Sequence, residues 1–170
     1  DRFVAAARLL QDRNPPLRVV LSAAPHVVIE ERRCPFPVVR SASLAVFRAA
    51  DAAVCKSGTT TLEAAVAGCP HVVAYRTHPL TFFAARRLVK VPRIGLVNIV
   101  AGREVAPEFV QDKLEPASMA RALEPLIDLQ RPERAQMVQA FGIVRDALGQ
   151  PGAAVRVASI AQAMAEGRPA

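Results

Sequence analysis

Short apolar runs alternate with amphipathic stretches up to about residue 115. The apolar runs are Val-rich, which is typical of strands buried on both faces of a sheet. They cover residues 17–22, 37–41, 52–55, 71–75 and 94–98. Between them, apolar side chains recur at helical spacing, most clearly over 2–13, 44–50 and 78–89. Strands that alternate with helices predict right-handed crossovers and a parallel sheet. The predicted fold class is therefore α/β, a Rossmann-like parallel sheet flanked by helices.

The pattern changes to helices alone in the last third of the chain. Helical spacing covers residues 116–129, 132–148 and 152–166, with Gly or Pro at each break. We therefore expect a Rossmann-like domain over 1–115 and C-terminal helices over 116–170 that pack on it or on a partner.

Composition and charge narrow the class of protein. Hydrophobic residues make up 52% of the 170 residues and aromatic residues only 5%, with no Trp, so the core is built from Ala, Val and Leu. No apolar run approaches the ~18 residues that a membrane-spanning helix needs. The first residue is Asp1, already in a helical pattern, and the chain is interpreted as a piece of a longer protein. The net charge of +7 favours anionic partners such as nucleotide phosphates or an acidic membrane surface, and nucleic acid less, because no aromatic residues interleave with the basic ones. The basic pairs themselves are better explained as solvated faces.

The three cysteines do not form a metal-binding motif. Cys34, Cys55 and Cys69 lie too far apart for a Cys-x-x-Cys site. An odd count without metal spacing indicates reduced thiols in a cytosolic compartment.

One loop carries the strongest functional signal. Ser57, Gly58, Thr59 and Thr60 lie between a buried strand and a helix, and Glu63 follows one helical turn later. Ligands of open parallel sheets bind at the carboxyl ends of strands, and the free N–H groups of a helix N-terminus attract anions. Such a loop would hold a phosphate, with Glu63 near enough to accept hydrogen bonds from a sugar. The alternative is a plain capped helix, in which the hydroxyl side chains cap its start and Glu63 completes a capping box.

Four further positions are candidates for ligand contacts. Arg76 follows a predicted strand at the same edge and would pair with a phosphate, or else form a surface ion pair. Asn98 ends the last predicted strand, where it would orient a ligand or simply form a turn. Glu108 and Gln111 lie three residues apart, on one face of a predicted helical turn. The sequence has no Ser-His-Asp order, metal-ligand cluster or Walker loop that would anchor a hydrolase, a metalloenzyme or an ATPase.

Two blocks of sequence resemble the lipid-A-disaccharide synthase family. The first covers residues 50–63 (ADAAVCKSGTTTLE) and 70–76 (PHVVAYR). The second covers residues 96–105 (LVNIVAGREV) and 107–111 (PEFVQ), and the basic segment 86–90 lies between the two. The resemblance is specific over about residues 51–111 and loose in the helices on either side.

The resemblance implies the C-terminal, donor-binding half of a GT-B glycosyltransferase. Members of the family transfer 2,3-diacylglucosamine from its UDP conjugate to 2,3-diacylglucosamine 1-phosphate, giving the β-1,6 lipid A disaccharide and UDP. The implied mechanism is inverting and needs neither a metal nor a cofactor. The implied location is the cytoplasmic face of the inner membrane of Gram-negative bacteria, as a peripheral protein without nucleic-acid partners, and a homodimer is one implied assembly.

The resemblance also assigns roles by position. Ser57, Gly58, Thr59 and Thr60 would hold the UDP phosphates, and Glu63 would bind the ribose. By the same resemblance, the donor site would be completed by Asn98, Glu108 and Gln111. Arg76 and Arg103 are candidates to face the diphosphate.

The chain also departs from the family pattern. The Pro-Gly-Ser-Arg loop expected before the first helix is absent, as is the N-terminal domain that would supply the acceptor site and the catalytic base. The stretch 22–37 is shorter than the family's strand–helix–strand segment. This chain alone is therefore expected to be inactive. Two alternatives stay open, namely a UDP-sugar 2-epimerase and a non-catalytic Rossmann-like binding module.

Overall fold

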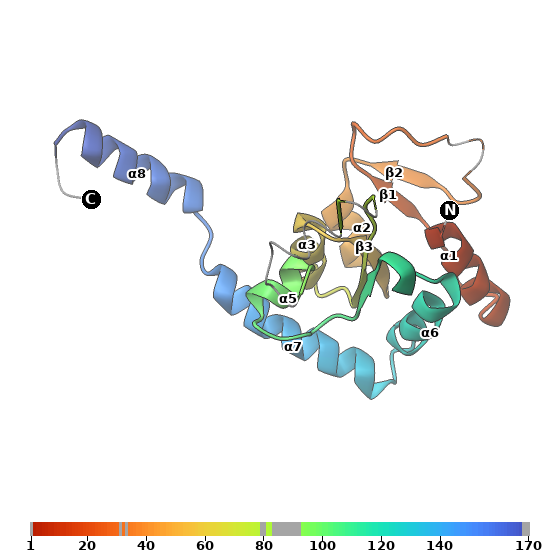
Figure 1. The fold of residues 1–170 in the computed structure, drawn as a ribbon. Helices are drawn as coiled ribbons and strands as arrows, with labels where there is room; N and C mark the ends of the chain where they lie inside the picture. Colours follow the sequence, from red (N-terminus) through yellow and green to blue (C-terminus); the bar gives the residue numbers. More distant parts are fainter. Residues whose placement is uncertain (1, 31, 33, 79–80, 83–92, 168–170) are drawn as a thin grey trace.

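The computed structural model describes residues 2–30, 32, 34–78, 81–82 and 93–167 (Figure 1). Within these residues the chain forms short parallel strands flanked by helices, which confirms the predicted α/β class. The strands are β1 (Leu21–Ala23), β2 (Val38–Arg40), β3 (Ala53–Lys56), β4 (His71–Tyr75) and β5 (Glu108–Val110). The helices are α1 (Arg2–Arg13), α2 (Ser43–Ala49), α3 (Thr59–Ala67), α5 (Leu96–Val100), α6 (Pro116–Ile127), α7 (Pro132–Leu148) and α8 (Ala153–Ala165).

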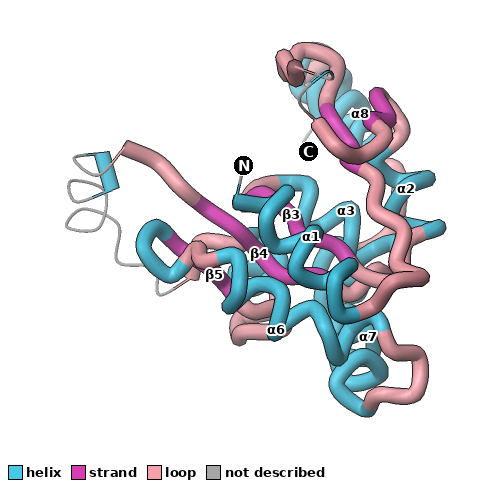
Figure 2. The backbone as a smooth tube through the Cα atoms, turned by 90° about the vertical axis from the view of Figure 1, so that its right-hand side faces the viewer, coloured by secondary structure: helices cyan, strands magenta, loops and turns pink. Residues whose placement is uncertain are grey.

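All described strand pairs are parallel. One sheet pairs β1 with β2, and the other has the order β3-β4-β5 (Figure 2). Val54 lies opposite Val72, and Tyr75 lies opposite Val110. The β3–α3–β4 unit is therefore the crossover that the sequence predicts, because a helix between adjacent strands requires them to run in parallel.

Helices cover both faces of the three-stranded sheet. Val72 and Ala74 of β4 pack against α1 and α6, whereas Val73 between them packs against α3, α5 and α7. Alternate residues of a strand point to opposite faces, so a run of consecutive apolar residues is what a strand between two helical layers needs. Each buried Val contributes roughly 1.5–3 kcal/mol.

The first helix is joined to the helices of the last third. Helix α1 packs against α6, and the Arg2 guanidinium donates to the carbonyl of Leu114 at 2.6 Å. Ala6 and Leu10 supply the buried face of α1. The sheet is therefore covered on one face by two helices that lie far apart in the sequence.

Two predicted elements are wrong in type. Residues 94–98 were expected to form a strand, but Leu96–Val100 is the helix α5. Conversely, residues 107–111 were expected to form a helical turn, but Glu108–Val110 is the edge strand β5, followed by a 3₁₀ turn over Gln111–Lys113. A short apolar run fits a buried helix as well as a strand, and here contacts with distant residues decide between them. The predicted strand 17–22 shrinks to Leu21–Ala23.

The C-terminal third is helical, as predicted. Helices α6 and α7 pack into the same apolar clusters as the sheet. Helix α8 instead lies apart from the rest of the fold (Figure 1), and all its residues except Ala163 are exposed. Most of the predicted helix 78–89 falls outside the described residues.

Candidate functional site

The carboxyl ends of the strands gather several of the predicted residues at one edge. Ser57 follows β3, Arg76 follows β4 and Gln111 follows β5. Gln111 at this edge has a positive φ angle of 51°, and Ser41, which follows β2 of the other sheet, has one of 57°. Such backbone angles are uncommon outside glycine and concentrate at functional sites. This is the edge at which open parallel sheets bind ligands.

Helix α3 begins at this edge without a side-chain cap. Gly58 is the N-cap residue, with φ 139° and ψ −162°, a conformation that essentially only glycine adopts. The expectation that Ser57, Thr59 or Thr60 caps the helix is therefore wrong. Ser57 Oγ donates instead to the carbonyl of Ile94 at 2.9 Å.

The uncapped end of α3 is open to an incoming group. The first N–H groups of a helix have no partners within it and carry the positive end of its dipole. Among the described residues, no atom lies within 4 Å of a Cβ atom placed on Gly58, so none of them fills this side of the loop. The arrangement suits a small anion such as a phosphate.

Glu63 lies within the second turn of α3 and does not form the capping box of the alternative interpretation. Its carboxylate accepts a hydrogen bond from Ser43 Oγ at 2.7 Å, and both side chains are half-buried. Ser43 is the first residue of α2, so this bond joins the start of α2 to the second turn of α3.

Asn98 is fully buried, and its amide is engaged by the chain itself. Its Oδ1 accepts the N–H groups of Val105 and Ala106 at 2.7 and 2.9 Å. Its Nδ2 donates to the Ala106 carbonyl at 2.7 Å and to Glu108 Oε1 at 2.8 Å. Asn98 therefore shapes the loop that leads from α5 into β5.

Glu108 fastens the start of α5 to the sheet. Its carboxylate accepts the N–H groups of Ile94 and Gly95, both at 2.9 Å. A Cβ atom on Gly95 would lie 3.1 Å from Glu108 Oε1 and 3.1 Å from Val73 Cγ2, so a side chain at this position would make these neighbours shift by a few tenths of an ångström. The half-buried Glu108 thus holds the segment that leads into a five-residue helix.

The remaining predicted residues are placed as follows. Gln111 hydrogen-bonds the backbone of Thr77 at the exit of β4. Arg76 is exposed beside it, and Arg103 is exposed in the loop after α5. The structure therefore brings the Ser57 loop, Glu63, Arg76 and Gln111 to one edge, whereas Asn98 and Glu108 support that edge from inside.

Two residues near this edge were not predicted from the sequence. Ser43 gave no signal, because its contact with Glu63 joins two separate helices. Thr61 was hidden within the hydroxyl-rich run that was interpreted as a helix cap, yet it is fully buried.

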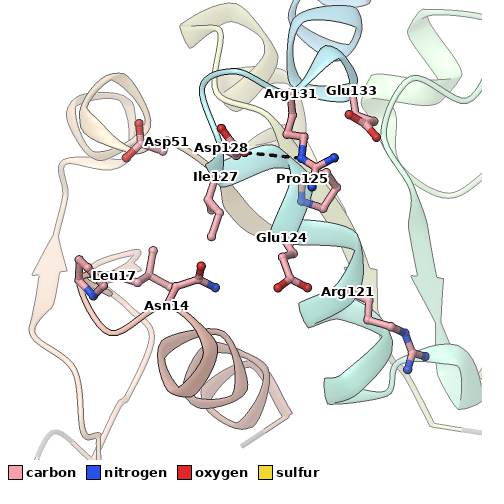
Figure 3. A pocket seen from close by; sticks show the side chains of 11 residues that line it. Asn14, Leu17, Asp51, Arg121, Glu124, Pro125, Ile127, Asp128, Arg131 and Glu133 are labelled. Atoms are coloured by element: carbon pink, nitrogen blue, oxygen red, sulfur yellow. Dashed lines mark ion pairs between the residues drawn. The ribbon is translucent and has the colours of Figure 1, made fainter.

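The cavity of about 710 Å³ drawn in Figure 3 lies elsewhere. Asp51, which precedes β3, lines it together with Asn14, Leu17, Glu124 and Asp128, and Asp128 pairs with Arg131 at 3.5 Å. The start of β3 is the opposite end from Ser57, so this cavity is separate from the candidate site.

Within the described part of the chain, no group of three or more His, Cys, Asp or Glu residues is arranged to hold a metal ion. Nor is any helix in that part both long and apolar enough to cross a membrane.

Comparison with known proteins identifies relatives along almost the whole chain. A family model described as lipid-A-disaccharide synthetase matches residues 2–158. The lipid-A-disaccharide synthase of Trichlorobacter lovleyi is 39% identical over 175 residues, which cover 96% of this chain and 44% of the relative. That of Pseudomonas paraeruginosa is 41% identical over 170 residues, covering 95% and 44%. That of Erwinia tasmaniensis is 38% identical over 138 residues, covering 74% and 35%. The chain thus spans less than half the length of these relatives.

Proposed function

Because this chain belongs to the lipid-A-disaccharide synthase family, we propose that it is the UDP-sugar-binding part of a glycosyltransferase of lipid A biosynthesis. The complete enzyme would transfer 2,3-diacylglucosamine from its UDP conjugate to 2,3-diacylglucosamine 1-phosphate. The products would be the β-1,6 disaccharide and UDP. This chain would supply the donor side of the reaction and be inactive alone.

The observation that carries this proposal is the uncapped start of α3 at the ligand-binding edge of the sheet. Gly58 gives the first N–H groups of α3 no side-chain cap, and no residue that the structure describes fills the space beside this glycine. We assign the UDP phosphates to the loop of Ser57, Gly58, Thr59 and Thr60. The Glu63 carboxylate, held by Ser43, then serves as the acceptor for the ribose hydroxyls.

The proposed mechanism is an inverting displacement at the anomeric carbon, with UDP as leaving group. Negative charge grows on the diphosphate as the glycosidic bond breaks. The helix end stabilises this charge because its N–H groups are already oriented before the reaction. Arg76 and Arg103, both exposed, would add positive charge, and the reaction would then need no metal.

Asn98, Glu108 and Gln111 would complete the donor site. Their present contacts support an indirect contribution, since Asn98 and Glu108 bind the backbone around α5 and Gln111 binds Thr77. These residues would hold the loops that surround the nucleotide.

The location and the assembly of the protein are proposed from its net charge and from the exposed apolar residues of α8. The net charge of +7 would attract the chain to anionic lipids, which favours peripheral association with the cytoplasmic face of the inner membrane. The exposed apolar residues of α8, including Val155, Val157 and Met164, would be covered by a second copy in a homodimer or by another domain of the enzyme. We retain residues 1–115 as the nucleotide-sugar-binding domain and residues 116–170 as the helices that pack on it or on such a partner.

Calorimetric titration of the 170-residue chain with UDP, UMP and NAD tests the proposal. We expect UDP to bind more tightly than UMP, because the α3 N-terminus contacts the second phosphate, and NAD to bind weakly. Binding of none of the three would overturn the donor-site assignment and favour a non-catalytic module. If the complete enzyme bound UDP but epimerised the sugar, the UDP-sugar 2-epimerase alternative would hold.

A further inference from the structure

Thr61 joins two elements of the proposed donor site through one hydroxyl group. The side chain is fully buried, in the first turn of α3. Its Oγ1 donates to the Gly58 carbonyl at 2.8 Å and accepts the N–H of Val97 at 3.2 Å. A buried hydroxyl with a donor and an acceptor role both filled is fixed in orientation.

The bond to Gly58 constrains the group that would meet the phosphate. The Gly58 carbonyl and the Thr59 N–H belong to the same peptide unit, which is planar and trans, so the two groups point in opposite directions. Holding the carbonyl toward Thr61 therefore aims the Thr59 N–H away from α3 and into the free space beside the loop. Gly58 has no side chain that would restrict this peptide. The Thr61 backbone N–H also donates to the Gly58 carbonyl, at 3.1 Å, and the hydroxyl adds a second, shorter bond that restricts the peptide further.

The bond to Val97 connects this peptide to α5. Helix α5 has only five residues and no side-chain cap on Gly95. Its start is held by the Glu108 carboxylate on one side and by Thr61 on the other, while Ser57 Oγ binds the preceding Ile94 carbonyl. The Ser57 loop and α5 therefore cannot move independently while Thr61 keeps both bonds.

We propose that Thr61 is a positioning residue, which orients the Thr59 N–H toward the diphosphate and locks α5 against the loop. This inference rests on the proposed function for the identity of the ligand. Thr61 itself does not touch the ligand, because its side chain is buried and both hydrogen-bonding roles of its hydroxyl are taken.

The test compares Thr61→Val, which keeps the shape of the side chain but removes the hydroxyl, with Thr61→Ser, which keeps the hydroxyl. In Thr61→Val we expect UDP affinity to fall about fivefold to tenfold, the range that loss of one hydrogen bond produces. We also expect faster hydrogen exchange at Val97 and a shifted amide resonance at Thr59, both without ligand. Thr61→Ser should stay within about threefold of the wild-type affinity. Thermal melting checks that each variant folds, and Thr61→Ala replaces Thr61→Val if the latter does not.

The outcomes separate the inference from the proposed function. A folded Thr61→Val variant with wild-type UDP affinity, or with an unmoved Thr59 resonance, would overturn the positioning role. Failure of Thr61→Ser to restore UDP affinity would overturn it as well. If the wild-type chain bound no UDP, the proposed function would fail, and the Thr59 resonance would still decide whether the hydroxyl orients the loop.

Discussion

The side-chain amide of Gln111 forms a closed pair of hydrogen bonds with the backbone of Thr77. Thr77 N donates to Oε1 at 2.8 Å, and Nε2 donates to the Thr77 carbonyl at 3.0 Å. The ladder between β4 and β5 ends at Tyr75 and Val110. The amide of Gln111 thus takes the place of a further peptide in the ladder, after its own backbone has turned away at a φ of 51°.

Gln111→Leu should destabilise the fold, because it leaves the N–H and the carbonyl of Thr77 without partners. The expected loss is about 1–3 kcal/mol in the free energy of unfolding, measured in urea. Gln111→Glu keeps an acceptor for Thr77 N, and when protonated its O–H also replaces the lost donor, so this variant should lose less stability at a pH where it is protonated. Equal stability of the Leu variant and the wild type would contradict this structural role.

Asn98→Ala should cost at least about 2 kcal/mol of unfolding free energy, because it leaves buried N–H groups of Val105 and Ala106 unpaired. Asn98→Asp should also destabilise, since a carboxylate would then face Glu108 in place of an N–H donor. Chemical denaturation followed by circular dichroism measures both. A variant of full stability that no longer binds UDP would instead indicate a direct ligand contact.

Glu63→Ala should raise the donor KM of the complete enzyme and weaken UDP binding to this chain. Loss of a charge-assisted hydrogen bond to the ribose costs roughly 1.5–3 kcal/mol, a factor of about 10 to 150. Acceptor binding should change less. Ser43→Ala is the matched control, because it removes the support of the carboxylate but not the carboxylate, and it should lose less affinity. Unchanged affinity in Glu63→Ala would leave Glu63 as a link between helices.

His71 should make the stability of the fold depend on pH. The ring is fully buried, stacks on Phe141 at 5.2 Å and leaves Nε2 without a partner, and burial lowers its pKa from 6.5 to about 4. Between these values the unfolded chain binds the proton and the folded chain does not. Stability is therefore fully present above about pH 6.5 and falls as the pH drops, by up to about 1.4 kcal/mol per pH unit, until the loss levels off near pH 4.

Urea unfolding of the wild type and His71→Gln at pH 4.5 and 7.5 measures this effect. The wild type should lose more stability than the variant between the two pH values, since carboxylates contribute equally to both. Equal losses would show that His71 does not titrate as its surroundings indicate.

The cysteines should differ in reactivity. Burial raises the pKa of the Cys55 thiol well above its usual value, and it raises that of Cys69 to about 11, where Asp51 adds to the shift and Arg134 opposes it. Cys34 is only half-buried. Because the thiolate is the reactive form, Ellman's reagent at pH 8 should label Cys34 first and the other two only in denaturant. The fast phase should disappear in Cys34→Ser; rapid labelling that persists there would contradict the buried positions.

Local patterns predicted the elements whose stability comes from their own sequence. Helix α7 matches its predicted bounds because Pro132 starts it and Gly149 ends it. The crossover from β3 to β4 follows from two apolar runs around a helix. Local patterns could not show that residues 96–100 form a helix and residues 108–110 a strand, the reverse of the prediction. It depends on the Glu108 carboxylate, which accepts the N–H groups of Ile94 and Gly95 just before α5 from a position more than ten residues later.

The candidate site was likewise predicted where local sequence decides the structure, and missed where distant contacts decide it. The Ser57 loop was recognised from a glycine between a strand and a helix, and it lies at the expected edge. The inward direction of Asn98 was not visible, because an amide at the end of an apolar run is compatible with either a ligand or a buried loop. Only the positions of Val105 and Ala106 show which groups it meets.

The packing of α1 against α6 also affects the order in which the fold can be completed. The contact between Arg2 and Leu114 spans 112 residues. During synthesis at 5–20 residues per second, α1 leaves the ribosome roughly 5 to 25 seconds before its partner exists. For that time Ala6 and Leu10 can contact Val72 and Ala74 of β4 but not yet the residues of α6 that complete their clusters. The β3–α3–β4 crossover, whose contacts are local, can therefore form first, while the packing of α1 is completed only once α6 has been made.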